Sequence, residues 1–325
     1  MSLTKQLPVN CAGHKGDVIQ LAFSNVCESG YYLASASLDG KTMLRHGDSG
    51  DWVGTFIKEG DAVWSVDINK DATVLVTGGE DCTARIWSAV SGEHLNKIQL
   101  EAPVRAVTLS AKSSEMAVGC LDRQKGHCDD QLLLVYSLER LGMTSMFERQ
   151  THGVRDAIFC RDDRALLTSS HDRCIRLWDR NSNQQVHSIE MPHHAKSLEM
   201  CADERTVTIA YGRSVVFIDV ERFEVISHRR MPGRLVGASL HPLKQTFVCA
   251  GINQMVYKCD FATGEVLEQF QAHDEPIRCI KYSPDGEVFA TAANKGGLRL
   301  WQQTVGKKYA LWNTEPEHSN NETQI

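Results

Sequence analysis

The ten residues SSHDRCIRLW (169–178) have six related copies elsewhere in the chain. Each copy joins a polar turn to an apolar, strand-like run, and successive copies end about 40–50 residues apart. The copies are ASLDGKTMLR (36–45), GGEDCTARIW (78–87), HCDDQLLLVY (127–136), IAYGRSVVFI (209–218), AGINQMVYKC (250–259) and AANKGGLRLW (292–301). A repeat of this period is typical of the four-stranded blade of a β-propeller, so the sequence predicts seven blades.

A second family of segments precedes these windows, and its apolar residues alternate as they do in strands. The segments are VIQLAFS (18–24), VWSVDIN (63–69), VRAVTLS (104–110), VRDAIFC (154–160), AKSLEMC (195–201), VGASLHP (236–242) and IRCIKYS (277–283). Further short runs lie between and after the paired segments. We therefore predict an all-β fold, a single seven-bladed β-propeller of WD repeats, with blades near 12–57, 58–98, 99–149, 150–189, 190–230, 231–271 and 272–304.

The last blade has no evident fourth strand, whereas the N-terminus has a spare one, QLPVNC (6–11). An open ring would leave two bare sheet edges, so we predict that this strand pairs with the last blade and closes the ring. Residues 305–312, VGKKYALW, are a competing candidate that the sequence does not exclude. The propeller domain then covers 1–312, and the polar tail 313–325 is expected to be disordered.

Composition narrows the classes of protein that the chain could represent. The formal net charge is −6, which does not favour a nucleic-acid binder as a whole. The N-terminus has no apolar core of a secretory signal, and no run of 18 uncharged apolar residues predicts a membrane span. Eleven cysteines without a CxxC pair indicate a reducing compartment, so we expect a cytoplasmic and nuclear location.

WD repeats carry a hydrogen-bonded network of His, Ser or Thr, Asp and Trp, and here no blade has the complete set. Arg45 takes the Trp position of blade 1, Glu59 and Gln150 take His positions, Lys295 takes an Asp position, and Tyr136, Ile218 and Cys259 replace Trp in blades 3, 5 and 6. We interpret the remaining members as structural, because equivalent turns of separate blades cannot converge on one substrate. They are His14, Asp39, Asp81, Trp87, Asp172, Trp178, His273 and Trp301.

The second residue of each inner strand is expected near the central opening on one face of the ring. Four of these seven residues are basic, whereas Lys and Arg make up only 35 of 325 residues overall. The aligned residues are Ile19, Trp64, Arg105, Arg155, Lys196, Gly237 and Arg278. We hypothesise that Trp64 and the four cations bind an acidic peptide, a carboxylate or a phosphate-bearing partner. The alternative is that the long side chains are merely solvated.

Other polar groups give weaker signals. His193 and His194 are interpreted as exposed loop residues, and His127, Asp129 and Asp130 as a solvated loop rather than a metal site. Arg229, Arg230 and Arg234 could touch RNA phosphates, but a solvated strand end is favoured. We predict no catalytic residue, no metal and no cofactor, because no GxSxG, P-loop or HExxH motif occurs and the aligned channel positions supply only cations and apolar residues.

Several strings outside the repeat pattern resemble one family. They are YYLASASLDGKTMLRHGDSGDWVGTF (31–56), NKDAT (69–73), WSAVSGE (87–93), AYGRSVVF (210–217), ASLHP (238–242), YSPDGE (282–287) and LRLWQQTVGKKYALW (298–312). From about residue 10 to 312 the chain is similar to the serine/threonine kinase receptor-associated proteins, also called unr-interacting proteins. MLRHGDSGDW and LWQQTVGKKYALW are the most specific parts, while LDRQKGHCDDQ (121–131) and the start of blade 4 depart from the family pattern.

The resemblance implies a non-catalytic scaffold that works as a monomeric subunit of larger complexes. Its implied partners are subunits of the survival-of-motor-neuron complex in small nuclear ribonucleoprotein assembly, the protein unr in translation, and proteins of the TGF-β receptor pathway. Contact with RNA would be indirect, and the protein would not insert in a membrane. Two alternatives stay open: a WD-repeat subunit of a translation-initiation complex, and direct RNA binding through the positive ring.

Overall fold

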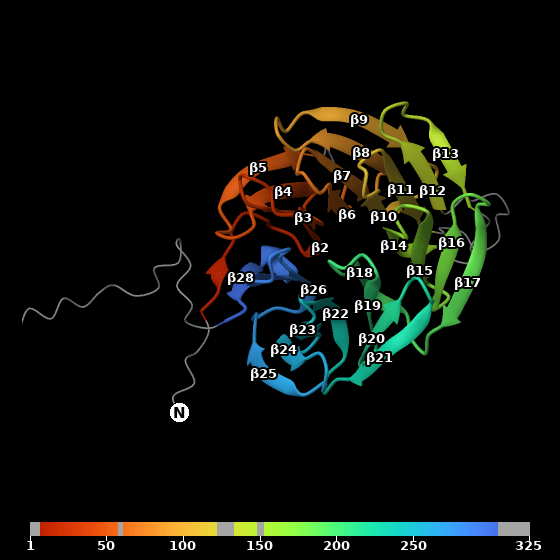
Figure 1. The fold of residues 1–325 in the computed structure, drawn as a ribbon. Coiled ribbons are helices and arrows are strands. Elements are labelled where there is room, and N and C mark those ends of the chain that lie inside the picture. The colour runs from red at the N-terminus through yellow and green to blue at the C-terminus, as the bar shows by residue number, and fades with distance from the viewer. Residues whose placement is uncertain (1–6, 58–60, 122–132, 148–152, 305–325) are drawn as a thin grey trace, which may run out of the picture.

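A ring of seven four-stranded antiparallel sheets surrounds a central channel (Figure 1). The computed structural model describes residues 7–57, 61–121, 133–147 and 153–304. Within these residues the regular structure is strand, apart from one short 3-10 turn, η1 (Asn294–Gly296). No helix in this part of the chain is long and apolar enough to cross a membrane. The predicted fold class, an all-β seven-bladed propeller, is confirmed.

Each blade runs from an inner strand at the channel to an outer strand at the rim. Blade 1 consists of β2 (Val18–Phe23), β3 (Tyr32–Ser37), β4 (Lys41–His46) and β5 (Trp52–Ile57). Blade 2 consists of β6 (Val63–Ile68), β7 (Val74–Gly79), β8 (Thr83–Ser88) and β9 (His94–Gln99). Blade 3 consists of β10 (Val104–Leu109), β11 (Glu115–Cys120), β12 (Leu133–Ser137) and β13 (Met143–Met146). Two-residue alternation alone would predict half-buried strands, but the second strands are buried on both faces because neighbouring blades cover them.

The second half of the ring repeats this order. Blade 4 consists of β14 (Val154–Cys160), β15 (Ala165–Ser170), β16 (Cys174–Asp179) and β17 (Gln184–Glu190). Blade 5 consists of β18 (Ala195–Met200), β19 (Thr206–Tyr211), β20 (Ser214–Asp219) and β21 (Glu224–Arg230). Blade 6 consists of β22 (Leu235–Leu240), β23 (Thr246–Gly251), β24 (Met255–Asp260) and β25 (Val266–Gln271). Blade 7 has three strands of its own, β26 (Ile277–Tyr282), β27 (Val288–Ala293) and β28 (Leu298–Gln302).

The N-terminal strand completes blade 7. β1 (Val9–Asn10) pairs antiparallel with β28, so that Val9 lies opposite Leu300 and Asn10 opposite Arg299. Arg299 also donates to the side-chain oxygen of Asn10 at 2.9 Å. In Figure 1 the red first strand lies beside the blue β28. Closure by the N-terminal strand is therefore confirmed; the competing segment 305–312 lies outside the described residues.

Each inner strand has a register irregularity at its second residue. In blade 2, for example, the pairing steps from Val63 to Ser65, and Trp64 has no partner on β7. The same step follows the first residue of β2, β10, β14, β18, β22 and β26. A bulge of this kind re-aims one side chain. The fold therefore presents one residue per blade, at the same height, to one mouth of the channel.

Side chains of one inner strand accept backbone N–H groups of the next. Gln20 accepts from Val66 at 3.1 Å, and Ser65 accepts from Val107 at 2.9 Å. The same link joins blades 5 and 6 through Ser197, and blades 6 and 7 through Ser239. These hydrogen bonds satisfy backbone donors that face the channel rather than a ladder partner. They hold the inner strands of neighbouring blades together.

Aromatic pairs between blades form much of the outer core. The indole of Trp87 packs edge-on against Phe56 of blade 1, with ring centroids 5.6 Å apart. Trp178 contacts Phe147 at 5.9 Å in the same way, and Trp301 contacts Phe270 at 4.7 Å. Each Trp thus buries a large apolar area against the preceding blade. The Trp-bearing strands stabilise the contact between blades as well as their own sheet.

Candidate partner-binding site at the channel mouth

The seven bulge residues line one mouth of the channel. Trp64, Arg105, Arg155, Lys196 and Arg278 all contribute to the lining of a cavity of about 90 Å³, together with Ile19 and Val236. The prediction that Gly237 is the blade 6 member is wrong. β22 starts at Leu235, one residue earlier than the alignment assumed, so its bulge residue is Val236. The cations and the aromatic ring predicted from the other blades are brought together.

Arg105 and Trp64 are in direct contact at this mouth. The guanidinium carbon of Arg105 lies 4.3 Å from the centroid of the Trp64 ring, a cation–π contact. The indole N–H of Trp64 donates to Glu80 at 2.8 Å, which fixes the ring under the guanidinium. Burial and the nearby Arg155 lower the pKa of Arg105 to about 10. The site therefore holds this cation at an electrostatic cost.

The other three cations differ in the groups that neutralise their positive charge. Arg278 forms an ion pair with Asp17 at 2.9 Å and donates to Asn294 at 2.5 Å. Arg155 is half-buried and donates from Nε to the carbonyl oxygen of Ala195 at 3.2 Å. Lys196 is exposed. Arg278 is thus neutralised within the blade 7 to blade 1 junction, whereas Arg155 and Lys196 have no carboxylate ion pair among the described residues.

The pKa of Lys196 reports a positive local field. Burial lowers it, and Arg155, Arg234, Arg105 and Arg278 lower it further, in that order. Burial also lowers the pKa of Arg155, although Asp156 opposes this. A set of cations that disfavour one another is what a mouth built to receive an anion would have.

A layer of charged side chains lies deeper in the channel, at inner-strand positions other than the aligned second residues. Burial raises the pKa of Asp156 to about 6 and that of Glu199 to about 7. Burial raises the pKa of Asp67 as well. Lys281 is attracted by all three carboxylates, Glu199 most strongly, and its pKa is raised although burial alone would lower it.

Two of these carboxylates have a structural task. Asp67 accepts from the backbone N–H of Leu109 at 2.8 Å, and Asp156 accepts from that of Leu198 at 3.2 Å. Both bonds join an inner strand to the next blade, like those of Ser65 and Ser197. The sequence signal was available, because Asp67 and Asp156 are acidic residues within the segments predicted as inner strands.

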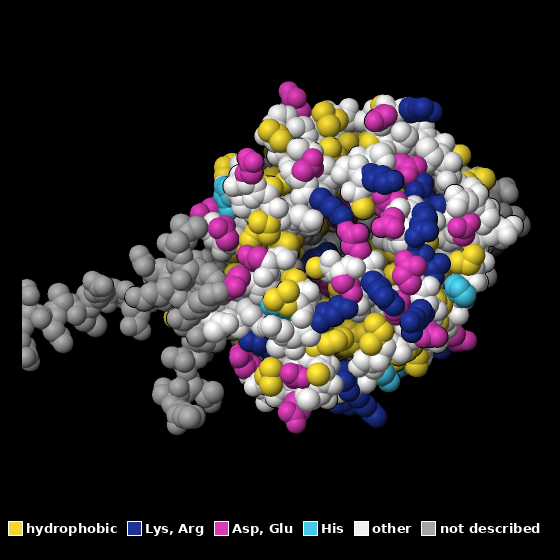
Figure 2. All heavy atoms as spheres, viewed as in Figure 1, with side chains coloured by type: hydrophobic (Ala, Val, Ile, Leu, Met, Phe, Trp, Pro, Cys, Tyr) yellow, Lys and Arg dark blue, Asp and Glu magenta, His cyan; other side chains and the backbone are white. Residues whose placement is uncertain are grey.

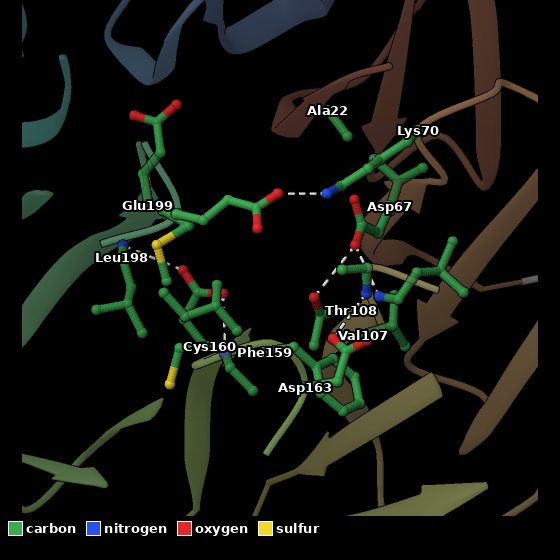
Figure 3. A pocket seen from close by; sticks show the side chains of 18 of the residues that line it. Ala22, Asp67, Lys70, Val107, Thr108, Phe159, Cys160, Asp163, Leu198 and Glu199 are labelled. Carbon is green, nitrogen blue, oxygen red and sulfur yellow. Dashed lines mark hydrogen bonds and ion pairs between the residues drawn. The ribbon is translucent and has the colours of Figure 1, made fainter. Parts of the chain in front are cut away.

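The opposite end of the channel is bridged by an ion pair. Lys70 and Glu204 form this ion pair, and Figure 3 shows Lys70 beside Asp67 among the side chains that line this end of the channel. Lys70 follows the inner strand of blade 2 and Glu204 follows that of blade 5, so the pair spans the ring. The cavity beneath has a volume of about 210 Å³. Figure 2 shows side chains of both charge signs around the central opening on the face it views. The mouth lined by Arg105, Arg155, Lys196 and Arg278, here called the Arg-rich mouth, lies at the other end of the channel.

The blade networks of blades 1 and 7 are built on His. His14 lies 3.2 Å from Asp39 through Nδ1 and 2.9 Å from Ser35 through Nε2. In blade 7 the hydroxyl of Thr291 accepts from Trp301 at 2.8 Å and lies 2.7 Å from Nε2 of His273. Lys295, at the Asp position, is ion-paired with Glu275. The residues interpreted as structural in these two blades thus bond within their own sheets.

Blades 2 and 4 use a different arrangement. Trp87 donates to Thr77 at 3.0 Å, and Trp178 donates to Thr168 at 2.9 Å. Asp81 and Asp172 are each ion-paired with an arginine four residues later on the adjoining strand, Arg85 at 2.8 Å and Arg176 at 2.5 Å. Sequence reasoning did not assign these arginines. Glu59 and Gln150, the residues at the His positions, lie outside the described residues.

The remaining candidates do not gather into a site. His193 and His194 are exposed, and His194 lies 5.9 Å from the ring of His171. Arg229 donates to the carbonyl oxygen of Ala262 at 2.7 Å and so joins blades 5 and 6. The segment with His127, Asp129 and Asp130 lies outside the described residues. Within the described ranges, no group of three or more His, Cys, Asp or Glu residues could hold a metal ion.

Comparison with known proteins agrees with this architecture. The family profile described as "WD domain, G-beta repeat" matches residues 50–88, 143–179 and 264–302. Each match ends just after one of the three buried Trp residues that donate to a Thr. The serine-threonine kinase receptor-associated protein of Gallus gallus is 39% identical over 320 residues, which cover 98% of this chain and 89% of that protein. The chain belongs to the serine-threonine kinase receptor-associated protein family.

Other members extend the family across distant organisms. The serine-threonine kinase receptor-associated protein of Homo sapiens is 38% identical over 95% of this chain and 86% of its own length. That of Dictyostelium discoideum is 32% identical over 91% of this chain and 98% of its own. A weaker similarity is to a protein of another name: subunit I of eukaryotic translation initiation factor 3 from Nematostella vectensis is 22% identical over 90% of this chain and 95% of that subunit. The resemblance inferred from the sequence is confirmed, and the chain is a WD-repeat protein of the scaffold type.

Proposed function

We propose that this protein is a non-catalytic interaction scaffold whose Arg-rich channel mouth contacts a negatively charged segment of a partner. One observation carries the proposal: Arg105, Arg155 and Lys196 are set at the same bulge of three successive blades and line one cavity with Trp64. Holding like charges together costs free energy, so their convergence needs a reason other than stability. A bound anion supplies that reason.

Family membership over nearly the whole chain supports a finer proposal. We infer that the protein is a monomeric subunit of the survival-of-motor-neuron complex in small nuclear ribonucleoprotein assembly, present in cytoplasm and nucleus. The name of the relatives supports a second role, association with serine-threonine kinase receptors, which we propose to be those of the TGF-β receptor pathway. Partnership with unr in translation is the third. RNA would then be reached through protein partners.

Two further readings are outcomes of the test. The similarity to subunit I of translation initiation factor 3 supports a role in that complex, but at 22% identity it is weaker than the family match. Direct RNA binding would use the same cations and would give an affinity that falls steeply as salt rises, without any protein partner.

The deciding experiment is affinity purification with mass spectrometry at moderate salt. Wild type is compared with a variant in which Arg105, Arg155, Lys196 and Arg278 are changed to Glu, after circular dichroism has established that the variant folds. We expect survival-of-motor-neuron subunits with wild type and their loss with the variant. Recovery of those subunits by both proteins would remove the channel mouth from the proposal. Recovery of initiation-factor proteins alone would overturn the assembly role.

A further inference from the structure

The charges at the Arg-rich mouth do not balance. Asp17 pairs with Arg278, and Glu80 is held by the indole of Trp64 beside Arg105. Arg155 and Lys196 have no ion pair with a carboxylate in the part of the chain that the structure describes. At least two positive charges therefore face the cavity without a counter-charge at their own height.

The hydrogen-bond donors of two arginines at this mouth are also incompletely used. Nη1 of Arg105 is buried and has no hydrogen-bond partner among the described residues. Arg155 uses Nε on the carbonyl oxygen of Ala195, and no bond of its two terminal nitrogens is seen within the described structure. A buried donor without a partner costs free energy comparable to a lost hydrogen bond. An acceptor with several oxygens would recover that cost.

The depth of the channel limits where an anion can lie. Asp156 adjoins Arg155 in the sequence, and both Asp156 and Glu199 line the same cavity below the cations. An anion that moved deeper would meet these carboxylates, so it is held at the rim. The cavity of about 90 Å³ admits the tip of one side chain rather than a folded segment.

We propose that the mouth formed by Arg105, Arg155 and Lys196 binds the phosphate group of a phosphorylated Ser or Thr in a partner protein. The inference rests on the proposed scaffold function and names the chemistry of its ligand. A phosphomonoester carries about −1.5 to −2 charges at pH 7 and has three strong acceptor oxygens. It matches two uncompensated cations, whereas an Asp or Glu side chain supplies one charge. Guanidinium groups also bind phosphate oxygens in a bidentate geometry.

The same geometry argues against a nucleic acid at this mouth. Sequence-tolerant binding of single strands uses exposed aromatic faces on which bases stack. Trp64 is the aromatic residue of the described cavity lining, and Arg105 already covers one face of its ring. Phosphodiesters also carry only one charge each. An RNA ligand is therefore an outcome of the test and not the proposal.

The test uses the full chain and three peptides, acetyl-Ala-Gly-X-Gly-Ala-amide, that differ only at X, which is phosphoserine, sulfoserine or Glu. Sulfoserine keeps the tetrahedral oxygens but has a single charge. Dissociation constants are measured by isothermal titration calorimetry at pH 7.5 and constant ionic strength. We expect the phosphoserine peptide to bind at least about tenfold tighter than either other peptide, as one additional charged hydrogen bond implies.

The variants separate the mouth from charge in general. Arg155→Gln and Lys196→Gln are each expected to weaken the phosphoserine peptide by about tenfold, and Arg105→Gln similarly. Arg278→Gln is expected to have a smaller effect, because Arg278 is already paired with Asp17. Arg140→Gln with Arg222→Gln, two exposed arginines of outer turns, is the matched control and should change nothing. Lys196 is exposed, so its variant stays informative even if the Arg105 variant fails to fold.

Each outcome decides the matter. Equal binding of the three peptides, or unchanged binding by Arg155→Gln and Lys196→Gln, would overturn the phosphate site. Tighter binding of a single-stranded RNA oligonucleotide that is lost in the same variants would replace it with a nucleic-acid site. Selective phosphopeptide binding combined with unchanged partner recovery in the purification experiment would keep the phosphate site and reject the proposed partners.

Discussion

Nη2 of Arg45 donates to the carbonyl oxygen of Ala12 over 2.5 Å, and this bond links the strand that closes the ring to the first complete blade. Arg45 is only 2% exposed and occupies the position that Trp holds in blades 2, 4 and 7. Its Nη1 donates to the carbonyl oxygen of Gly50 at 3.2 Å. Blade 1 thus replaces an indole by a guanidinium that reaches the segment after β1. The guanidinium strengthens the closure of the ring, but it places a charge in the interior. Burial of this charge lowers the pKa of Arg45.

The first prediction concerns this closure. Arg45→Met keeps an apolar stem but removes both donors, so the carbonyl groups of Ala12 and Gly50 lose their partner. We expect the free energy of unfolding to fall by about 2–4 kcal/mol. Urea denaturation of wild type and variant measures it, with exposed Arg140→Met as the control. A change below about 0.5 kcal/mol would show that Arg45 does not hold the closing segment.

Two equivalent threonines provide a second, internally matched prediction. Thr291→Val removes the acceptor of Trp301 and the partner of His273, both buried in blade 7. Thr77→Val in blade 2 removes the acceptor of Trp87. Because an unpaired buried polar group costs about 1–3 kcal/mol, Thr291→Val should destabilise more than Thr77→Val by about that amount. Equal losses in thermal or chemical unfolding would contradict the shared role of Thr291.

The fold could be predicted because a repeat of about 40 residues specifies one sheet many times over. Blade number, strand order and closure by the N-terminal strand all followed from counting strands and matching bare edges. The blade 6 alignment failed by one residue because LVGASL has apolar or small residues at every position, so alternation does not fix its start. A one-residue slip exchanges the side chain that faces the channel, and Val236 was therefore missed.

The candidate site was predictable only where the aligned position carries a charged or aromatic side chain. Trp64 and the four cations were identified because the bulge recurs in every blade. The pairing of Arg278 with Asp17 was not predictable, because it joins residues from opposite ends of the chain across the closure. The cluster around Lys281 was missed for a related reason. Its members come from four blades and meet only at the axis of the closed ring.

A third prediction uses the carboxyl group of Glu199. Burial raises its folded-state pKa from an ordinary value of 4.5 to about 7, and Lys281 only partly opposes this. Between these values the folded protein binds a proton that the unfolded chain releases, so stability falls as pH rises through this window. Glu199→Gln should be more stable than wild type by about 1–3 kcal/mol at pH 8 and nearly equal to it at pH 4.5. Parallel curves of unfolding free energy against pH would sink the idea.

The fourth prediction removes the counter-charge of the same cluster. Lys281→Met leaves Asp67, Asp156 and Glu199 without the cation between them, and an unpaired buried charge costs about 3–5 kcal/mol. The loss should be largest at pH 8 and smaller near pH 5, where Asp156 and Glu199 take up protons. Adding Glu199→Gln to Lys281→Met should restore part of the loss. A double-mutant cycle with a coupling energy near zero would mean that Lys281 and Glu199 do not interact.

The fifth prediction is that the cations of the mouth are kept against the interest of stability. Arg155, Arg234, Arg105 and Arg278 all disfavour the charge of Lys196. Lys196→Gln should therefore leave the free energy of unfolding unchanged or raise it by up to about 1 kcal/mol in low salt, and added salt should erase the gain. Arg278→Gln breaks the pair with Asp17 and should show no gain. Urea titrations at 20 mM and 500 mM salt measure the free energy of unfolding of both variants. The electrostatic screening length is about 22 Å at the lower salt concentration and about 4 Å at the higher. If Lys196→Gln were destabilising, the cations would have a structural role, and the case for a site shaped by its ligand would lose its energetic basis.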